Sequence, residues 1–199
     1  MTAISQSERP SSMRVSALPV WIIVFLTLAA LMLGWLVKTV AESQTRNVER
    51  AGIFASVPAG WSVRFGVAQE ETIFSASDPF NPQVALSVSL FPAVPGGKLT
   101  DSVVSRNLTN AKSLNSYKVL DQGPVKERNR EGYRVVFAFV QPNGPDVLPE
   151  VIKGIDYYFI EGDQVLVFSM TAPVSRYDGA LGQFYRFVRS GRVAAGGVK

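Results

Sequence analysis

Residues 152–171 read IKGIDYYFIEGDQVLVFSMT, and this stretch decides the fold. It contains two runs, Ile152–Ile160 and Val165–Thr171, in which apolar residues occupy both odd and even positions. Successive side chains of a strand point to opposite faces, so such runs predict strands that are covered on both faces. Tyr133–Val140 is a third run of the same kind. We therefore expect these three strands at the centre of a sheet.

Further strands and two helices are predicted around this centre. Val84–Phe91 alternates apolar residues with Ala and Ser, which is typical of a strand with one buried face. A helix is predicted from Asp101 to about Leu114, with Thr100 as its cap, and a second from Arg176 to about Ser190. Shorter strands are predicted at Ser62–Val67, Thr72–Ala76, Tyr117–Leu120 and Val125–Glu127. The fold class is α+β, a central antiparallel β-sheet flanked by helices as an α/β/α sandwich.

An uncharged run, Ala17–Val37, lies before this domain and reads ALPVWIIVFLTLAALMLGWLV. At about 1.5 Å of rise per residue a helix of this length spans roughly 31 Å, which matches the ~30 Å hydrocarbon core of a bilayer. We expect one N-terminal transmembrane helix, within residues 15–38, that serves as a signal anchor. The alternative is a signal peptide that is cleaved before Glu42.

The orientation of this helix does not follow from charge, because positive residues flank the run on both sides in similar number. A short polar tail, an apolar run and then a large domain form the layout of an exported signal anchor. We therefore expect a single-pass protein of the cell membrane, with its C-terminal domain extracytoplasmic. The lipid bilayer is then its first predicted partner.

The chain divides into five predicted segments, of which one is a folded domain of common size. They are a disordered tail at 1–14, the signal anchor at 15–38, a linker or stalk at 39–53, the domain at 54–193 and a flexible tail at 194–199.

The chain contains no His and no Cys in 199 residues. This excludes Ser-His and Cys-His nucleophile pairs, zinc sites with imidazole or thiolate ligands, and disulfides. Carboxylates remain at Asp146, Glu150 and Asp156, and at Glu161 and Asp163, but their spacing matches no EF-hand loop. We interpret them as solvated turn residues. We expect no enzymatic activity, no cofactor and no bound metal.

The formal net charge is +4, and the excess lies in two places. One is a predicted hairpin tip around Arg128, in which Glu127 and Glu131 are interleaved, and the other is the C-terminal helix. Either can dock an acidic partner, although a solvated turn also explains the first. No aromatic residues interleave the face of the helix that carries the arginines, so nucleic acid is not an expected partner. The candidate partner-docking residues are Lys126, Arg128, Arg130, Arg176, Arg186, Arg189 and Arg192.

The loop Gln141–Pro149 joins two of the central strands and contains three prolines. Loops that a rigid scaffold presents often carry recognition residues. The segment is therefore a candidate recognition loop, and a long ordered turn is the alternative interpretation.

Several motifs, taken in order, resemble the PsbP-like domain, a family named for an extrinsic subunit of photosystem II. They are Val57-Pro-Ala-Gly-Trp61, Ser77-Asp-Pro79, Gly132-Tyr-Arg-Val-Val-Phe137, Glu161-Gly-Asp-Gln-Val-Leu-Val167 followed by Thr171-Ala-Pro173, and a closing helix that ends in Val-x-Ser. The resemblance covers Phe54–Val193. It implies an α/β/α sandwich without enzymatic activity that acts as an accessory, assembly or stabilising factor of a membrane complex.

The chain also departs from this family. It has no histidine, so the metal-binding residues proposed in some members are not carried over, and a photosystem function is not implied. We interpret Trp61, Asp78 and Pro79 of these motifs as fold determinants.

The expected function is that of a membrane-anchored, non-enzymatic accessory subunit. Through a protein–protein interaction it would dock on, assemble or stabilise a complex with another membrane protein. An extracytoplasmic module that binds a small ligand or a cation is the alternative.

Overall fold

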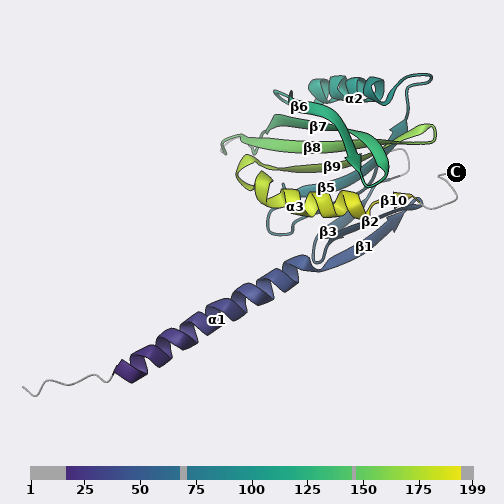
Figure 1. Ribbon diagram of the computed structural model, residues 1–199. Helices are drawn as coiled ribbons and strands as arrows, with labels where there is room; N and C mark the ends of the chain where they lie inside the picture. Colours follow the sequence, from purple (N-terminus) through teal and green to yellow (C-terminus); the bar gives the residue numbers. More distant parts are fainter. Residues whose placement is uncertain (1–16, 68–70, 145–146, 194–199) are drawn as a thin grey trace, which may run out of the picture. The chain divides into compact units, whose positions relative to one another are not determined.

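The computed structural model describes residues 17–67, 71–144 and 147–193 (Figure 1). The chain forms two compact units, residues 1–43 and 44–199. The described part of the first unit is one helix, α1 (Ala17–Ser43). The second unit holds the sheets and the remaining helices.

A seven-stranded antiparallel sheet forms the centre of the second unit, with the strand order β3-β4-β5-β9-β8-β7-β6. The apolar runs Ile152–Ile160 and Val165–Thr171 form β8 and β9, and residues 155–159 and 165–168 within them are buried. These two strands and β7 lie inside the sheet, so the prediction for the three central strands is confirmed. The bounds are β3 (Ser62–Phe65), β4 (Thr72–Ser77), β5 (Ala85–Pro92), β6 (Lys118–Glu127), β7 (Arg130–Gln141), β8 (Glu150–Glu161) and β9 (Gln164–Pro173).

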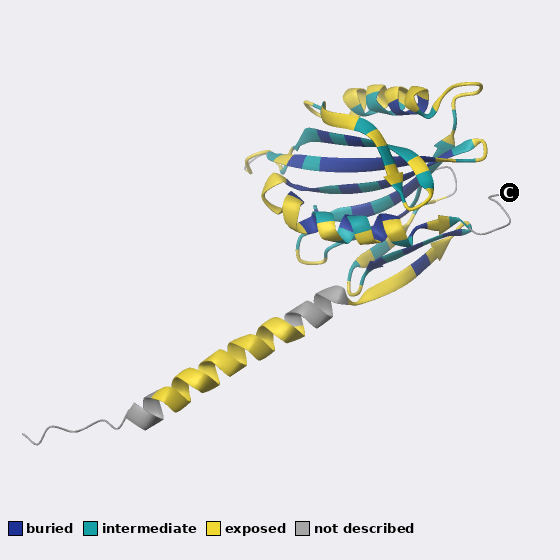
Figure 2. Ribbon diagram, viewed as in Figure 1, coloured by how far each residue is buried: buried dark blue, intermediate teal, exposed yellow. Residues whose placement is uncertain are grey.

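Helices cover both faces of this sheet, with the buried residues between them (Figure 2). On one face α2 (Leu99–Ser113) packs Val103 into a cluster that includes Tyr158. On the other face α3 (Val174–Ser190) packs against Phe159. Tyr158 and Phe159 are successive residues of β8, so the two clusters lie on opposite faces. The α+β class, with an antiparallel sheet and flanking helices, is confirmed.

A second sheet of three strands lies on the α3 side and begins earlier than expected. Its strands are β1 (Thr45–Arg50), β2 (Ile53–Pro58) and β10 (Arg192–Val193), in the order β1-β2-β10. Residues 39–53 were expected as a linker, but residues 39–43 continue α1 and Thr45–Arg50 pairs with β2. The sequence shows no strand pattern at β1, because Val48 is the one buried residue among the six of this strand.

Two element boundaries also differ from the expectations. β6 is one continuous edge strand, whereas the sequence predicted two strands separated by Gly123 and Pro124. An edge strand tolerates proline, since its outward N–H has no partner in the sheet. α2 begins at Leu99, so Thr100 lies within its first turn and does not cap it. Instead, the Asp101 carboxylate accepts a hydrogen bond of 2.7 Å from the Lys98 N–H.

The predicted transmembrane helix is not confirmed. Across the described residues, no helix combines the length and the apolar character that a membrane span requires. Residues 15 and 16, and the predicted tails at 1–14 and 194–199, lie outside the described residues.

Candidate docking surface

The two basic segments of the sequence meet at one end of the domain. The β6–β7 hairpin turns at Arg128 and Asn129, and its Glu127 carboxylate accepts a hydrogen bond of 2.9 Å from the Arg189 guanidinium. The Arg130 guanidinium donates to the carbonyl of Val188 over 3.4 Å. Both contacts hold the hairpin tip against the last turn of α3. The sequence could not predict this pairing, since about 60 residues separate the partners.

Arg130 is used inside the domain and is half-buried. Its guanidinium carbon lies 4.4 Å from the ring centre of Phe159 and 5.7 Å from that of Phe168. The Glu161 carboxylate lies 3.7 Å from its Nη1. Burial lowers the pKa of the Arg130 guanidinium, and the nearby Glu161 opposes that shift. Arg130 was expected to dock a partner, but these contacts give it a packing role instead.

Arg176 lies apart from the other arginines. It lies in the first turn of α3, ten residues before Arg186, which corresponds to about 15 Å along a helix. There it lines a pocket of about 340 Å³ together with Trp61 and Asp78. The expected continuous face of four helical arginines is therefore divided between the two ends of α3.

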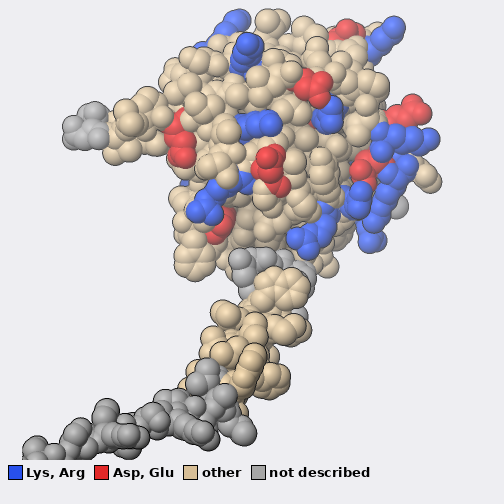
Figure 3. Space-filling model, turned by 60° about the vertical axis from the view of Figure 1, so that its left-hand side comes forward, with Lys and Arg blue, Asp and Glu red and all other residues tan. Residues whose placement is uncertain are grey.

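Five of the seven candidate residues remain exposed and close to the hairpin–helix contact. We call them the basic surface: Lys126, Arg128, Arg186, Arg189 and Arg192. Arg189 is paired with Glu127, whereas the other four side chains form no ion pair within the described part of the chain. Figure 3 shows Lys and Arg side chains gathered on one side of the domain, with Asp and Glu interspersed. Unpaired, solvated cations of this kind can attract an acidic surface.

The backbone at the hairpin tip is strained. Arg128 has a φ of 55°, in the left-handed region where an L side chain costs roughly 1–2 kcal/mol. Glycine adopts this conformation without that cost. The chain instead places an exposed guanidinium at the tip of the basic surface.

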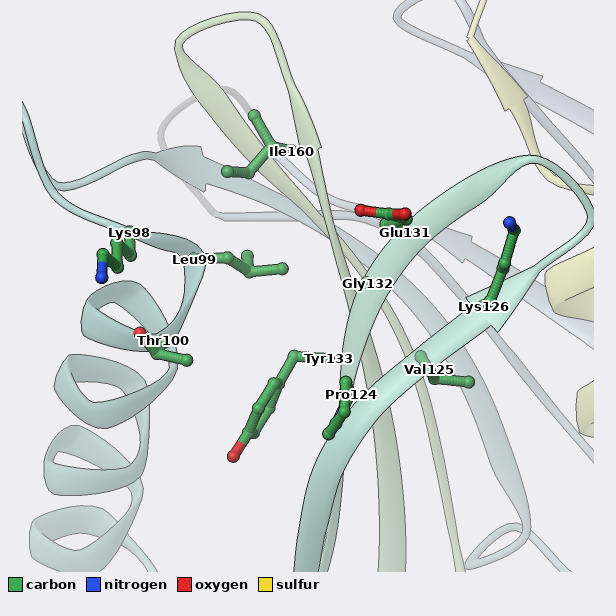
Figure 4. Close-up of a pocket in the computed structure, with 10 residues that line it drawn as sticks. All are labelled: Lys98, Leu99, Thr100, Pro124, Val125, Lys126, Glu131, Gly132, Tyr133 and Ile160. Atoms are coloured by element: carbon green, nitrogen blue, oxygen red, sulfur yellow. The ribbon is translucent and has the colours of Figure 1, made fainter.

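A pocket of about 680 Å³ lies between the first turn of α2, the β6–β7 hairpin and the end of β8 (Figure 4). The side chains of Leu99 and Tyr133 point into the space between the helix and the hairpin, and Ile160 lies above it. Lys98, Lys126 and Glu131 provide charged groups at its edge. Its size is in the range of small-molecule sites. Sequence reasoning missed this pocket because its lining comes from four separate elements.

Asp156 was interpreted as a solvated turn residue, but it lies buried in β8 and is 4% exposed. The Tyr158 hydroxyl donates to its Oδ2 over 2.9 Å, and its Oδ1 has no hydrogen-bond partner in the described residues. Burial raises the pKa of the Asp156 carboxyl to about 6, and the Ser169 and Tyr158 hydroxyls limit the increase. The misinterpretation arose because a charged residue between Ile155 and Tyr157 breaks the apolar pattern.

Asp146, which was grouped with Asp156 as a cation candidate, lies outside the described residues. Among the residues that are described, no group of three or more carboxylates, His or Cys is arranged to hold a metal ion.

No protein-family model matches the chain, and no curated protein matches it. Among solved structures, the fold is similar to cyanobacterial PsbP from Synechocystis sp. PCC 6803, at 16% identity over 77% of this chain and 93% of that chain, with a TM-score of 0.57. It is also similar to the Ran-binding protein Mog1p of Saccharomyces cerevisiae, at 16% identity over 75% of this chain and 95% of that chain, with a TM-score of 0.52. At such identities the likeness concerns the fold alone. The second unit has the fold that PsbP and Mog1p share.

Proposed function

We propose that this chain is a membrane-anchored, non-enzymatic accessory domain that docks on an acidic surface of another membrane protein and so helps to assemble or stabilise a complex. The basic surface carries this proposal. Four of its five cations have no acidic partner among the described residues. The strained Arg128 holds one of them at the very tip of the hairpin.

The proposed anchor is α1, in a bilayer, with the domain on the extracytoplasmic side. Residues 21–37 of this helix are all exposed, and they include Phe25, Met32 and Leu33 at 64–72% exposure. A helix that is apolar on every side is stable where its surroundings bury those side chains. The uncharged run Ala17–Val37 has the length of a bilayer core, so lipid is the proposed surrounding.

The position of the basic surface favours a protein, and not the bilayer, as its partner. The domain begins at Gln44, whose carbonyl accepts a hydrogen bond of 2.9 Å from the Ala59 N–H, close to Trp61. Trp61 shares a pocket with Ser175 at the start of α3. The basic surface lies at the other end of this 17-residue helix, about 25 Å away. The basic surface therefore lies at the opposite end of the domain from Gln44, where the chain enters it.

Two physical consequences follow from this proposal. Attraction between exposed charges weakens as salt screens them, so the complex should dissociate more readily at high ionic strength. Tethering both partners in one membrane raises their effective concentration, so a modest affinity is sufficient.

The test is crosslinking of the full chain in native membranes, followed by purification in mild detergent. The triple variant Lys126→Glu, Arg128→Glu and Arg186→Glu should lose the crosslinked complex. The control Arg64→Glu, Lys112→Glu and Lys118→Glu makes the same change in charge at exposed residues outside the basic surface, and it should retain the complex. A chain that always purifies alone, or equal losses in both variants, would contradict the proposal.

A second candidate function is small-ligand binding, which the pocket of about 680 Å³ favours. A ligand that binds only the folded chain raises its melting temperature with saturation. The variant Ile160→Trp replaces an aliphatic side chain of the pocket lining with a bulky indole ring, and it should abolish the rise in melting temperature. If no compound in a broad screen shifts the melting temperature, this candidate is contradicted.

A further inference from the structure

Four apolar side chains are exposed at the end of the domain where the chain arrives from α1. Phe80 lies in the β4–β5 connection at 89% exposure, and Leu148 in the β7–β8 connection at 88%. Val147, the chain neighbour of Leu148, and Val174, the first residue of α3, are 57% and 53% exposed. We call these four residues the apolar end. Large apolar groups gathered at one site of a surface often mark an interaction site.

The loop that carries Phe80 is closed by hydrogen bonds at its base. The Asp78 carboxylate accepts 2.9 Å and 3.2 Å bonds from the Phe80 N–H and the Asn81 side chain. The Asp78 N–H donates to the carbonyl of Val84 over 3.0 Å. Pro79 and Pro82 restrict the backbone further. The exposure of Phe80 is therefore a fixed feature of this loop.

Asn143 links this loop to the one that carries Leu148. Its Oδ1 accepts a hydrogen bond of 3.4 Å from the Gln83 side chain, and its Nδ2 donates to the Leu148 carbonyl over 3.3 Å. Two connections that are about 60 residues apart in the sequence are thus held together. The apolar end is one site built from both loops.

The register of the strands places this site near the start of the domain. Ser62 pairs with Ser77 and Ala85 with Thr171, so the starts of β3 and β5 and the ends of β4 and β9 share one edge. Ala59, which binds the Gln44 carbonyl, lies just before β3. Gln44 is the single residue between α1 and β1. Gln44, the residue through which the chain enters the domain, consequently lies at this edge.

We propose that the apolar end inserts into the interface of the bilayer in which α1 is anchored. This inference rests on the proposed anchor. Insertion removes Phe80 and Leu148 from water, and it holds the domain with its basic surface turned away from the lipid. The acidic groups at this end, Asp78, Glu150 and Asp178, outnumber Arg176 and Lys153, so the end has no excess positive charge that would require an anionic lipid, and the matching lipid surface is zwitterionic.

The chain contains no cysteine, so single cysteines can be spin-labelled without background. The full chain is placed in phosphatidylcholine nanodiscs with a label at Phe80→Cys or Leu148→Cys. Leu28→Cys in α1 and Arg128→Cys on the basic surface serve as references. Collisions of the label with oxygen report lipid, and collisions with a nickel chelate report water. Labels at 80 and 148 should collide more often with oxygen than with the nickel chelate, as is also expected for the label at 28. The label at 128 should collide more often with the nickel chelate.

Three results would overturn the inference, and they have different meanings. If the labels at 80 and 148 collide with the nickel chelate while the label at 28 collides with oxygen, the anchor is intact and the apolar end lies in water. Shielding of 80 and 148 from both reagents means that protein covers them, either a partner or a second copy. Nickel access at 28 removes the anchor, and the proposed function with it.

Discussion

The two ends of α3 carry opposite kinds of surface. Near its start lie Phe80 and Leu148, which are apolar and 89% and 88% exposed. Near its end lie the five cations of the basic surface, four of them without an acidic partner among the described residues. The domain begins at the first end. The contrast indicates a division of roles, in which we assign the apolar end to lipid and the basic surface to a protein partner.

The largest effect is expected from a glycine at the basic end of α3. A Cβ on Gly191 would overlap the ring of Phe168, so Gly191→Ala should lower the free energy of unfolding by about 3 kcal/mol. Gly179, near the other end, has open space around its Cα. Gly179→Ala should raise the free energy of unfolding by about 1 kcal/mol. Denaturant unfolding of the full chain measures both, and equal effects at the two positions would contradict this packing.

Asp156 lies in the middle of β8, between the two ends of the domain, and it should make the stability of the folded chain depend on pH. Its pKa is about 6 in the folded chain, against 3.8 for an ordinary Asp carboxyl. The folded state therefore favours the neutral acid, and stability should fall by about 2 kcal/mol as the pH rises from 4 to 7. Asp156→Asn should remove this decrease. Thermal unfolding across this pH range gives the slope, and an unchanged slope in the variant would exclude Asp156 as its origin.

Arg130 tests whether the basic surface depends on the contact between hairpin and helix. Arg130→Ala removes two cation–π contacts and the bond to Val188, and it should cost about 2 kcal/mol. Hydrogen exchange should then accelerate in the hairpin and the last turn of α3, and stay unchanged near Phe80. Lys126→Ala, at an exposed position of the same hairpin, is the control and should change stability little. Equal acceleration at both ends of α3 would show that the ends are not independent.

The smallest effect is expected from Arg128 at the tip of the hairpin. Arg128→Gly relieves the positive φ and should stabilise the chain by about 1 kcal/mol. It also removes one cation from the basic surface, so the same variant should weaken docking. Stability from denaturant unfolding and complex yield from crosslinking should move in opposite directions. A gain in both would mean that Arg128 takes no part in docking.

Much of the fold was predictable because burial leaves a pattern in the sequence. β8 and β9 are covered on both faces, so their apolar runs identified them. β1 escaped because it buries only Val48, and β6 was divided because Pro124 is tolerated at an edge. Strands such as β1 and β6 are defined by their pairing with neighbouring strands, and this pairing cannot be predicted from the local sequence.

The candidate site was predictable in composition and less so in arrangement. Charge alone identified Lys126, Arg128 and Arg189, yet it could not separate them from Arg130, which stacks on aromatic rings from β8 and β9. Helical spacing grouped Arg176 with arginines at the other end of α3. The loop at 141–149 was singled out, but neither the exposure of Leu148 nor the bond from Asn143 to its carbonyl could be read from the sequence. Contacts between distant segments decide which charges and apolar groups remain free.

Photocrosslinking from both ends of the domain tests the central claim most directly. A photoreactive amino acid is placed at Arg186 in one full-length variant and at Leu148 in another, and each is illuminated in native membranes. The account predicts a protein adduct of defined mass from position 186 and lipid adducts from position 148. Lipid adducts from 186, or the same protein adduct from both positions, would contradict it.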